Sequence, residues 1–278
     1  MSPIPELEGE IVVTSLESRI KELSVAPGTV ACVWLGQAGY LLKTPAGVIV
    51  MIDPYLSDYA EAQWGMARIL PPPIDPEQIQ PNLLLVSHWH EDHLDAPLVK
   101  RWAKLNPGWF GGSIASVPRA QAWGWPANRT VLLDLGMTHA QEDVHVTAHF
   151  ARHHTPEAPA TDAVSFLLTI DGVAIWAVCD TEYDARLRAM ANLNIDVALT
   201  PINGVGGNWT DKEAALMLSY VRPRLAIPNH YNMWAPETFG AGATLDPNAF
   251  VETYRLLGGG ETRVLEVGEI VTFSKAAS

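Results

Sequence analysis

The most constraining feature of this sequence is an apolar run that leads directly into a loop crowded with metal-binding side chains. Residues 82–86 read Asn-Leu-Leu-Leu-Val, the composition of a strand buried on both faces. Residues 87–95 then read Ser-His-Trp-His-Glu-Asp-His-Leu-Asp. Four candidate ligands fall within six residues of this loop: His88, His90, Asp92 and His93. Imidazole and carboxylate groups suit zinc, manganese or iron, so the loop predicts metal binding.

The spacing of these ligands predicts two metal positions rather than one. Alternation along an extended backbone places His88 and His90 on the same side, and Asp92 and His93 can then turn to a second point. The loop completes neither site by itself. The alternative is a solvated, histidine-rich surface turn, but an apolar strand that runs into H-x-H-x-D-H is more specific than an isolated H-x-H.

Two further candidate ligands follow predicted strands. His230 comes shortly after the predicted strand 225–227, at a position that suits a ligand. Asp180 follows the apolar strand 173–178. A carboxylate at the end of such a strand is costly to bury unless it is paired or bound to metal. Asp180 is therefore the natural bridge between two metals.

The last ligand is expected just beyond the predicted strand 144–150. His153 shares the alternation of that strand and His154 has the opposite parity, so parity alone leaves both open. The remaining histidines are expected in a turn, on the surface or in packing: His139, His145 and His149.

The overall pattern predicts an α/β fold. Short β segments dominate, and helices are expected at residues 97–105, 211–220 and 247–256. A capping box formed by Thr14 and Glu17 predicts the start of a first helix, and three glycines at 258–260 lead into a closing pair of strands. We therefore expect one domain over residues 1–278, with a sheet-on-sheet core and outer helices.

Composition excludes several classes of protein. A net charge of −13 argues against binding a phosphate backbone, so no nucleic-acid partner is expected. No apolar run reaches the length of a membrane span, and residues 1–10 hold three glutamates without a basic residue, unlike a signal peptide. Cys32 and Cys179 form no C-x-x-C pair, which excludes a disulfide scaffold or a cysteine-rich zinc site. A cytoplasmic protein that acts on a small molecule is the simplest interpretation.

The order of these ligands resembles the metallo-β-lactamase superfamily: an H-x-H-x-D-H loop, a later histidine, a strand-end aspartate and a final histidine. Within that superfamily the chain is similar to the L-ascorbate-6-phosphate lactonase group over nearly its whole length. The supporting segments are residues 25–29, 34–36, 88–95, 180, 195–199, 210–212 and 227–234. The resemblance implies a four-layer αβ/βα sandwich.

The resemblance also implies a role for each ligand. One metal would be held by His88, His90 and His153, the second by Asp92, His93 and His230, with Asp180 between them. The small-residue-x-His arrangement of Ala151 and His153 favours His153 over His154. Asp53 matches the first motif of the superfamily and would orient the histidine loop without binding metal. The cofactors implied are two divalent ions, zinc or manganese, with iron also open.

Two departures separate the chain from the lactonase. The chain is shorter, chiefly before the histidine loop and around the third motif, and those insertions shape the lactonase pocket. The lactonase lacks a histidine where His153 stands, whereas more general hydrolases of the superfamily have one. The resemblance therefore predicts the metal site of this chain but not its substrate.

The expected activity is hydrolysis. A bridged metal pair lowers the pKa of a shared water, and the resulting hydroxide would attack a carbonyl carbon or a phosphorus. Asp92 would orient this hydroxide and relay its proton, and Asn203 is either a hydrogen-bond donor to substrate or an ordinary turn residue. The leading hypothesis is a lactone or related small ester, phosphorylated or not. The alternative is a phosphodiester such as a cyclic nucleotide or a phospholipid-like molecule.

Other classes are disfavoured, and the oligomeric state, including a homo-oligomer, stays open. Di-iron redox proteins of this fold carry glutamate where this chain has His90, and the complete ligand set argues against metal binding without catalysis. Two groups of residues near the site loops could line a pocket. Phosphate could be bound by Arg68, Arg152 and Arg186. Apolar walls could come from Trp64, Trp89, Trp209 and Trp234.

Overall fold

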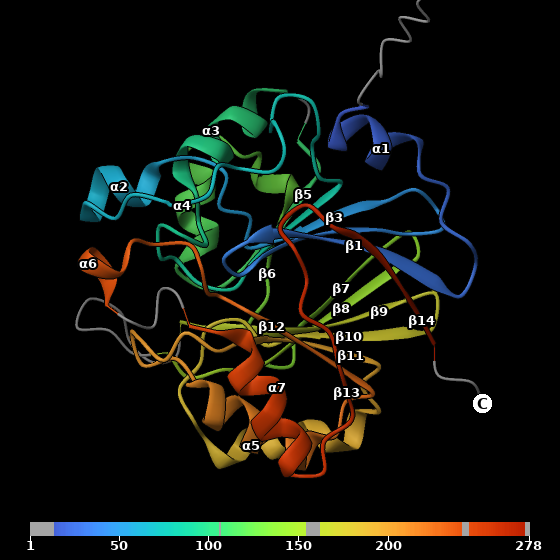
Figure 1. The fold of residues 1–278 in the computed structure, drawn as a ribbon. Helices are drawn as coiled ribbons and strands as arrows, with labels where there is room; N and C mark the ends of the chain where they lie inside the picture. Colours follow the sequence, from blue (N-terminus) through green and yellow to red (C-terminus); the bar gives the residue numbers. More distant parts are fainter. Residues whose placement is uncertain (1–13, 106, 154–161, 241–244, 276–278) are drawn as a thin grey trace, which may run out of the picture.

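The computed structural model describes residues 14–105, 107–153, 162–240 and 245–275. Within these residues the chain forms two seven-stranded sheets that pack face to face. Helices cover the outer face of each sheet, so the molecule has four layers (Figure 1). This arrangement confirms the predicted α/β sandwich.

The first sheet joins an antiparallel part to a parallel part. Strands β14, β1, β2 and β3 are antiparallel neighbours, and β3 to β6 are parallel. In spatial order the strands are β14 (Ile270–Ser274), β1 (Thr29–Gly36), β2 (Gly39–Lys43), β3 (Ile49–Ile52), β4 (Leu83–Val86), β5 (Trp109–Gly112) and β6 (Thr130–Leu132).

The second sheet is built in the same manner. Strands β7 to β10 are antiparallel neighbours, and β10 to β13 are parallel. In spatial order the strands are β13 (Glu261–Thr262), β12 (Leu225–Asn229), β11 (Val197–Pro201), β10 (Val173–Ala177), β9 (Val164–Ile170), β8 (Val144–Phe150) and β7 (Thr138–Gln141).

The helices divide between the two outer faces (Figure 1). On the side of the first sheet lie α1 (Leu16–Glu22), α2 (Tyr59–Trp64), α3 (Ala96–Leu105) and α4 (Ser116–Ala122). On the side of the second lie α5 (Asp211–Val221) and α7 (Pro247–Leu256). Shorter helical segments are η1 (Ala127–Arg129), η2 (Ala185–Leu193) and α6 (Pro236–Phe239). None of the helices in the described ranges is long and apolar enough to cross a membrane.

Strand alternation explains the two apolar layers of the first sheet. In β4, Leu83 and Leu85 belong to the core between the sheets, whereas Leu84 and Val86 pack beneath the helices. Both faces are therefore buried, as the continuous apolar run predicts.

The structure corrects two local expectations, the cap of the first helix and the place of His139. Ser15, not Thr14, caps α1 by accepting the backbone N–H of Ser18, because the carboxylate of Glu17 instead accepts the N–H of Asp75. The two expected closing strands both form, in different sheets: β13 pairs with β12, and β14 pairs with β1. His139 lies in β7 rather than in a turn.

Candidate metal centre

The candidate ligands collect at one edge of the sandwich because of strand direction. Strands β3 and β4 are parallel, and so are β8, β10, β11 and β12, since β9 runs opposite to its two neighbours β8 and β10. The loops after these strands carry every described site residue that the sequence predicts: Asp53, His88, His90, Asp92, His93, His153, Asp180, Asn203 and His230. Polar groups at the carboxyl ends of neighbouring parallel strands meet, as in many α/β folds.

The first group of candidate ligands consists of three histidines. One nitrogen from each of His88, His90 and His153 lies within 4.8 Å of the others. His90 Nδ1 is 2.8 Å from His88 Nε2 and 3.2 Å from His153 Nε2. His90 Nδ1 can take part in only one hydrogen bond, either as donor or as acceptor. In the other of its two contacts the nitrogens therefore face each other without a hydrogen bond. A cation at this point would satisfy all three lone pairs.

Burial keeps these three histidines neutral. Loss of solvent lowers the pKa of His153 to about 4 and places the pKa of His88 well below its ordinary value. The pKa of His90 is lowered for the same reason. Neutral imidazole is the form that binds metal, so at neutral pH these three side chains are already in the protonation state that metal binding requires.

The second group of candidate ligands contains both histidine and aspartate, and Asp180 lies between the two groups. Ligand atoms of Asp92, His93 and His230 lie within 4.8 Å of one another. Asp180 Oδ1 is 3.1 Å from His230 Nε2 and 3.4 Å from His93 Nε2. Its other oxygen, Oδ2, is 3.7 Å from His153 Nε2. The two oxygens of one carboxylate therefore face different ligand groups.

The charges in the second group favour a cation. Burial alone would raise the pKa of Asp180, but His230 and His93 outweigh it and hold this pKa well below its ordinary value. Burial lowers the pKa of His93, but Asp180, Asp92 and Asp53 together raise it well above the ordinary value. The carboxylates thus attract positive charge to this point, and a bound metal would replace the proton on His93.

Asp53 fixes the histidine loop from below. It is fully buried, and Oδ1 accepts the backbone N–H of Ser87 at 2.7 Å. Its Oδ2 accepts the Ser87 hydroxyl at 2.5 Å and the Nδ1–H of His93 at 2.9 Å. The bond to Nδ1 turns His93 Nε2 toward Asp180. The carboxylate therefore lies where the sequence predicts a residue that orients ligands.

A cavity of about 490 Å³ opens over both groups. Its floor is formed by His90, Asp92, His153, Asp180 and His230. Its walls are largely apolar, with contributions from Trp64, Met66, Trp89 and Val205. The remaining polar lining comes from Glu91, Asn203 and Asn208. Asn203 and Asn208 are buried, and each has a side-chain oxygen without a hydrogen-bond partner in the described part of the chain.

Several expected lining residues lie elsewhere. The three arginines are absent from the cavity lining because other groups engage them. Arg68 donates to backbone carbonyls, whereas Arg152 and Arg186 pair with acidic side chains. Trp209 and Trp234 are buried in the core. His154 lies outside the described residues.

Gln37 and Glu91 are neighbours of the ligands that sequence reasoning missed. The amide nitrogen of Gln37 lies 2.7 Å from Asp92 Oδ2 and 3.0 Å from His230 Nε2. Glu91 lines the cavity, and burial raises its pKa. Gln37 follows strand β1 in a glycine-flanked turn, so its place after a strand is the signal that would have found it.

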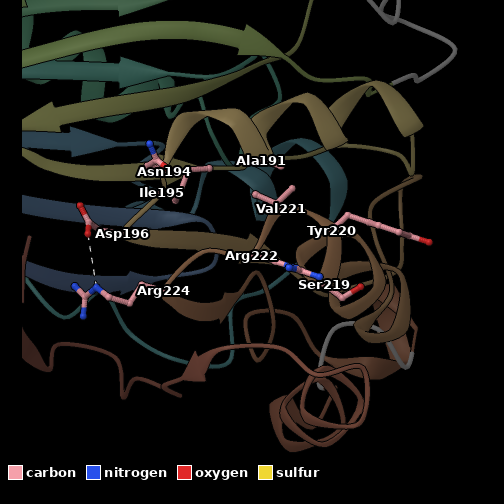
Figure 2. Close-up of a pocket in the computed structure, with 9 residues that line it drawn as sticks. All are labelled: Ala191, Asn194, Ile195, Asp196, Ser219, Tyr220, Val221, Arg222 and Arg224. Carbon is pink, nitrogen blue, oxygen red and sulfur yellow. Dashed lines mark ion pairs between the residues drawn. The ribbon is translucent and has the colours of Figure 1, made fainter. Parts of the chain in front are cut away.

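A second hollow, of about 550 Å³, lies at the opposite ends of the same parallel strands (Figure 2). Its lining includes Asn194, Ile195 and Asp196 before β11, and Arg222 and Arg224 before β12. Arg224 Nε is 3.6 Å from Asp196 Oδ1, so this ion pair occupies two of its charged side chains. Within the described ranges, the grouped metal-binding side chains lie at the other end of the sheet.

Comparison with known proteins identifies the family. Residues 32–230 match the model of the Beta-lactamase superfamily domain. The chain is 32% identical over 266 residues to a UPF0173 metal-dependent hydrolase of Anaeromyxobacter sp. (strain K), over 89% of this chain and 88% of the relative. The chain therefore belongs to the UPF0173 metal-dependent hydrolases of the β-lactamase superfamily.

Solved structures share the fold at lower identity. Igni18, a metallo hydrolase from the archaeon Ignicoccus hospitalis, has a TM-score of 0.68 and 23% identity, over 88% of this chain and 99% of that chain. CmlA, a diiron β-hydroxylase from Streptomyces venezuelae, has a TM-score of 0.64 and 14% identity, over 90% of this chain and 55% of that chain. These matches do not show the narrower resemblance to the ascorbate-phosphate lactonase group, which stays a prediction.

Proposed function

We propose that this hydrolase uses two metals to cleave a lactone or a related small, uncharged ester. The observation that carries the proposal is the placement of Asp180. Its two oxygens face the two neighbouring ligand groups, with Oδ1 3.1 Å from His230 Nε2 and Oδ2 3.7 Å from His153 Nε2. A carboxylate shared in this way is the ligand that a metal pair requires.

The donor set fits a pair of divalent cations. His88, His90 and His153 would hold one, Asp92, His93 and His230 the other, and Asp180 would bridge them. Zinc, manganese and iron all accept such nitrogen and carboxylate donors. When bound, these cations supply a water of lowered pKa and a positive pole for the substrate's oxygen.

Asp92 is suited to move the proton. It lines the cavity, and its Oδ2, which accepts a hydrogen bond from Gln37 at 2.7 Å in the metal-free protein, would be the oxygen that binds metal. Oδ1 is then the atom that accepts the proton of the attacking water and passes it to the leaving oxygen. Asn203 orients the substrate, because its buried amide lines the same cavity and its oxygen has no partner among the described residues.

The cavity favours an uncharged carbonyl substrate over a phosphate. No lysine or arginine lines it within the described residues, and the sequence of residues 154–161 contains neither. A phosphate would add negative charge beside Glu91 and Asp92, in a chain whose net charge is already −13. The apolar walls instead suit the hydrocarbon part of an ester or lactone.

A hydrolysis panel on metal-reconstituted protein tests this proposal. The panel contains acyl and sugar lactones, simple esters, phosphorylated sugar lactones and phosphodiesters including cyclic nucleotides. Asp180→Asn is compared with Asp196→Asn, a matched control that changes a buried aspartate at the opposite end of the same sheet.

We expect uncharged lactones or esters to be turned over. Asp180→Asn should lose more than about a hundredfold of that activity, since even residues that only orient metal ligands are worth 10- to 100-fold. Asp196→Asn should stay near wild type. Turnover of phosphodiesters alone would overturn the proposal.

A further inference from the structure

The side chain of Gln37 extends into the second ligand group from a rigid turn. Gln37 is fully buried between β1 and β2 and has a φ of +52°, a value that residues other than glycine rarely adopt. Its backbone carbonyl accepts the N–H of His230 at 2.9 Å and the indole N–H of Trp34 at 3.0 Å. These bonds hold the turn beside His230, so the side chain starts from a fixed point.

The amide nitrogen of Gln37 lies among the atoms that would bind the second metal. It is 2.7 Å from Asp92 Oδ2, 3.0 Å from His230 Nε2 and 3.2 Å from His93 Nε2. An amide carries two hydrogens, and the two shorter contacts can use both. One side chain of the protein itself therefore contacts all three ligand atoms of the Asp92–His93–His230 group.

We propose that Gln37 competes with the second metal for its position among Asp92, His93 and His230 and so weakens metal binding at this second site. This inference rests on the proposed two-metal function. Asp92 Oδ2, His93 Nε2 and His230 Nε2 cannot hold a cation between them while the amide nitrogen lies within 3.2 Å of all three, so metal binding requires the amide to withdraw. No described amide or hydroxyl hydrogen-bonds to the facing nitrogens of His88, His90 and His153, which contact each other. The first site should therefore fill before the second.

The expected cost to the second site is measurable. Each hydrogen bond that a metal must displace contributes about a factor of two to ten in an equilibrium constant, so two bonds weaken the site by about tenfold or more. Removal of the N–H donors should recover this factor at the second site alone.

Stepwise metal titration tests the inference without an activity assay. Metal-free protein is titrated with Zn²⁺ against a chromophoric chelator, and bound metal is counted by elemental analysis. Gln37→Met keeps the length of the side chain and removes its donors, and Gln37→Glu replaces the amide by a carboxylate that can bind metal. Gln121→Met is the matched control, because it removes an exposed glutamine whose amide donates to Thr130. Thermal melting of each metal-free variant checks folding.

We expect wild type to bind two ions, the second about tenfold or more weakly than the first. Gln37→Met should tighten the second step about tenfold, Gln37→Glu at least as much, and Gln121→Met not at all. Two ions could still bind to Gln37→Met with the affinity for the second ion unchanged or lower. That result would contradict competition by Gln37 and would leave the two-metal proposal intact. Binding of one ion in every variant would overturn the two-metal proposal itself. Should Gln37→Met fail to fold, an unchanged or weaker second step in Gln37→Glu overturns the proposed competition.

Discussion

The two halves of the sandwich share one plan but deliver their ligands differently. In each half an antiparallel meander leads into parallel strands, and polar residues follow the strand ends. The first half provides four ligand candidates in the single loop after β4. The second half provides one residue each after β8, β10 and β12: His153, Asp180 and His230. The ligands of the first half therefore form a motif that can be seen in the sequence, whereas those of the second half are far apart in the chain and are brought together only by the order of the strands.

The halves also differ in how the ligands are held. In the first half, Asp53 and Asp95 accept several hydrogen bonds each and fix the loop and its surroundings. Unusual backbone conformations do part of this work in both halves: φ is +52° at Gln37 and +42° at Asp53 in the first half, and +57° at Cys179 and +60° at His230 in the second. Such strain persists where the surrounding structure holds it, and it is common at functional sites.

The largest effect should come from the ligand that links the two groups. Asp180→Asn is expected to weaken both metals, because Oδ1 and Oδ2 face different groups. His90→Asn should weaken only the first metal and His230→Asn only the second. Stepwise titration with metal counting distinguishes these patterns. Loss of both metals from His90→Asn alone would show that the two groups are not separate sites.

The next effect concerns the support beneath the first half. Asp53→Asn is expected to lower second-metal affinity by about 10- to 100-fold, because His93 loses the carboxylate that orients its ring. The buried amide cannot replace all three accepted hydrogen bonds, so the unfolding free energy should also fall by about 2–4 kcal/mol. Asp134→Asn, which changes a carboxylate that accepts the N–H of Leu135, is the matched control. Unchanged metal affinity in Asp53→Asn would remove its orienting role.

A smaller effect is the response of the metal-free protein to acid. The folded-state pKa of His153 is about 4, below the ordinary value of 6.5, because burial disfavours the imidazolium. The unfolded chain therefore binds more protons between these values, so stability is present above pH 6.5 and is lost as pH falls toward 4. This residue alone accounts for about 3 kcal/mol.

Denaturant unfolding of metal-free protein across pH checks this expectation. His153→Asn should reduce the proton uptake on unfolding by about one, and His145→Asn, on the same strand region, should not. An identical pH slope in wild type and His153→Asn would contradict the assigned direction of the pKa.

These differences explain what sequence could and could not predict. The loop after β4 was predictable because an apolar strand and four ligands are adjacent in the chain. The choice between His153 and His154 needed the resemblance, since the alternation of a strand does not extend past its end. Gln37 was missed because its only signal is its place after a strand, since a glutamine has no metal-ligand spacing that would single it out. The role of the three arginines could not be read from the sequence, since nearby carbonyl and carboxylate groups engage them.

The smallest effect should come from the apolar wall above the centre. Trp64 lines the cavity, and its ring centroid lies 6.2 Å from that of His90. Because its side chain is partly exposed, Trp64→Ala should change stability by less than about 1 kcal/mol. Loss of apolar contact with substrate should raise KM by about tenfold and leave kcat nearly unchanged, as expected for binding shared by ground and transition states. Steady-state kinetics on the best substrate of the panel, beside the exposed control Leu256→Ala, measures this split. A fall in kcat at unchanged KM would show that Trp64 positions the metal-ligand loops rather than binding the substrate.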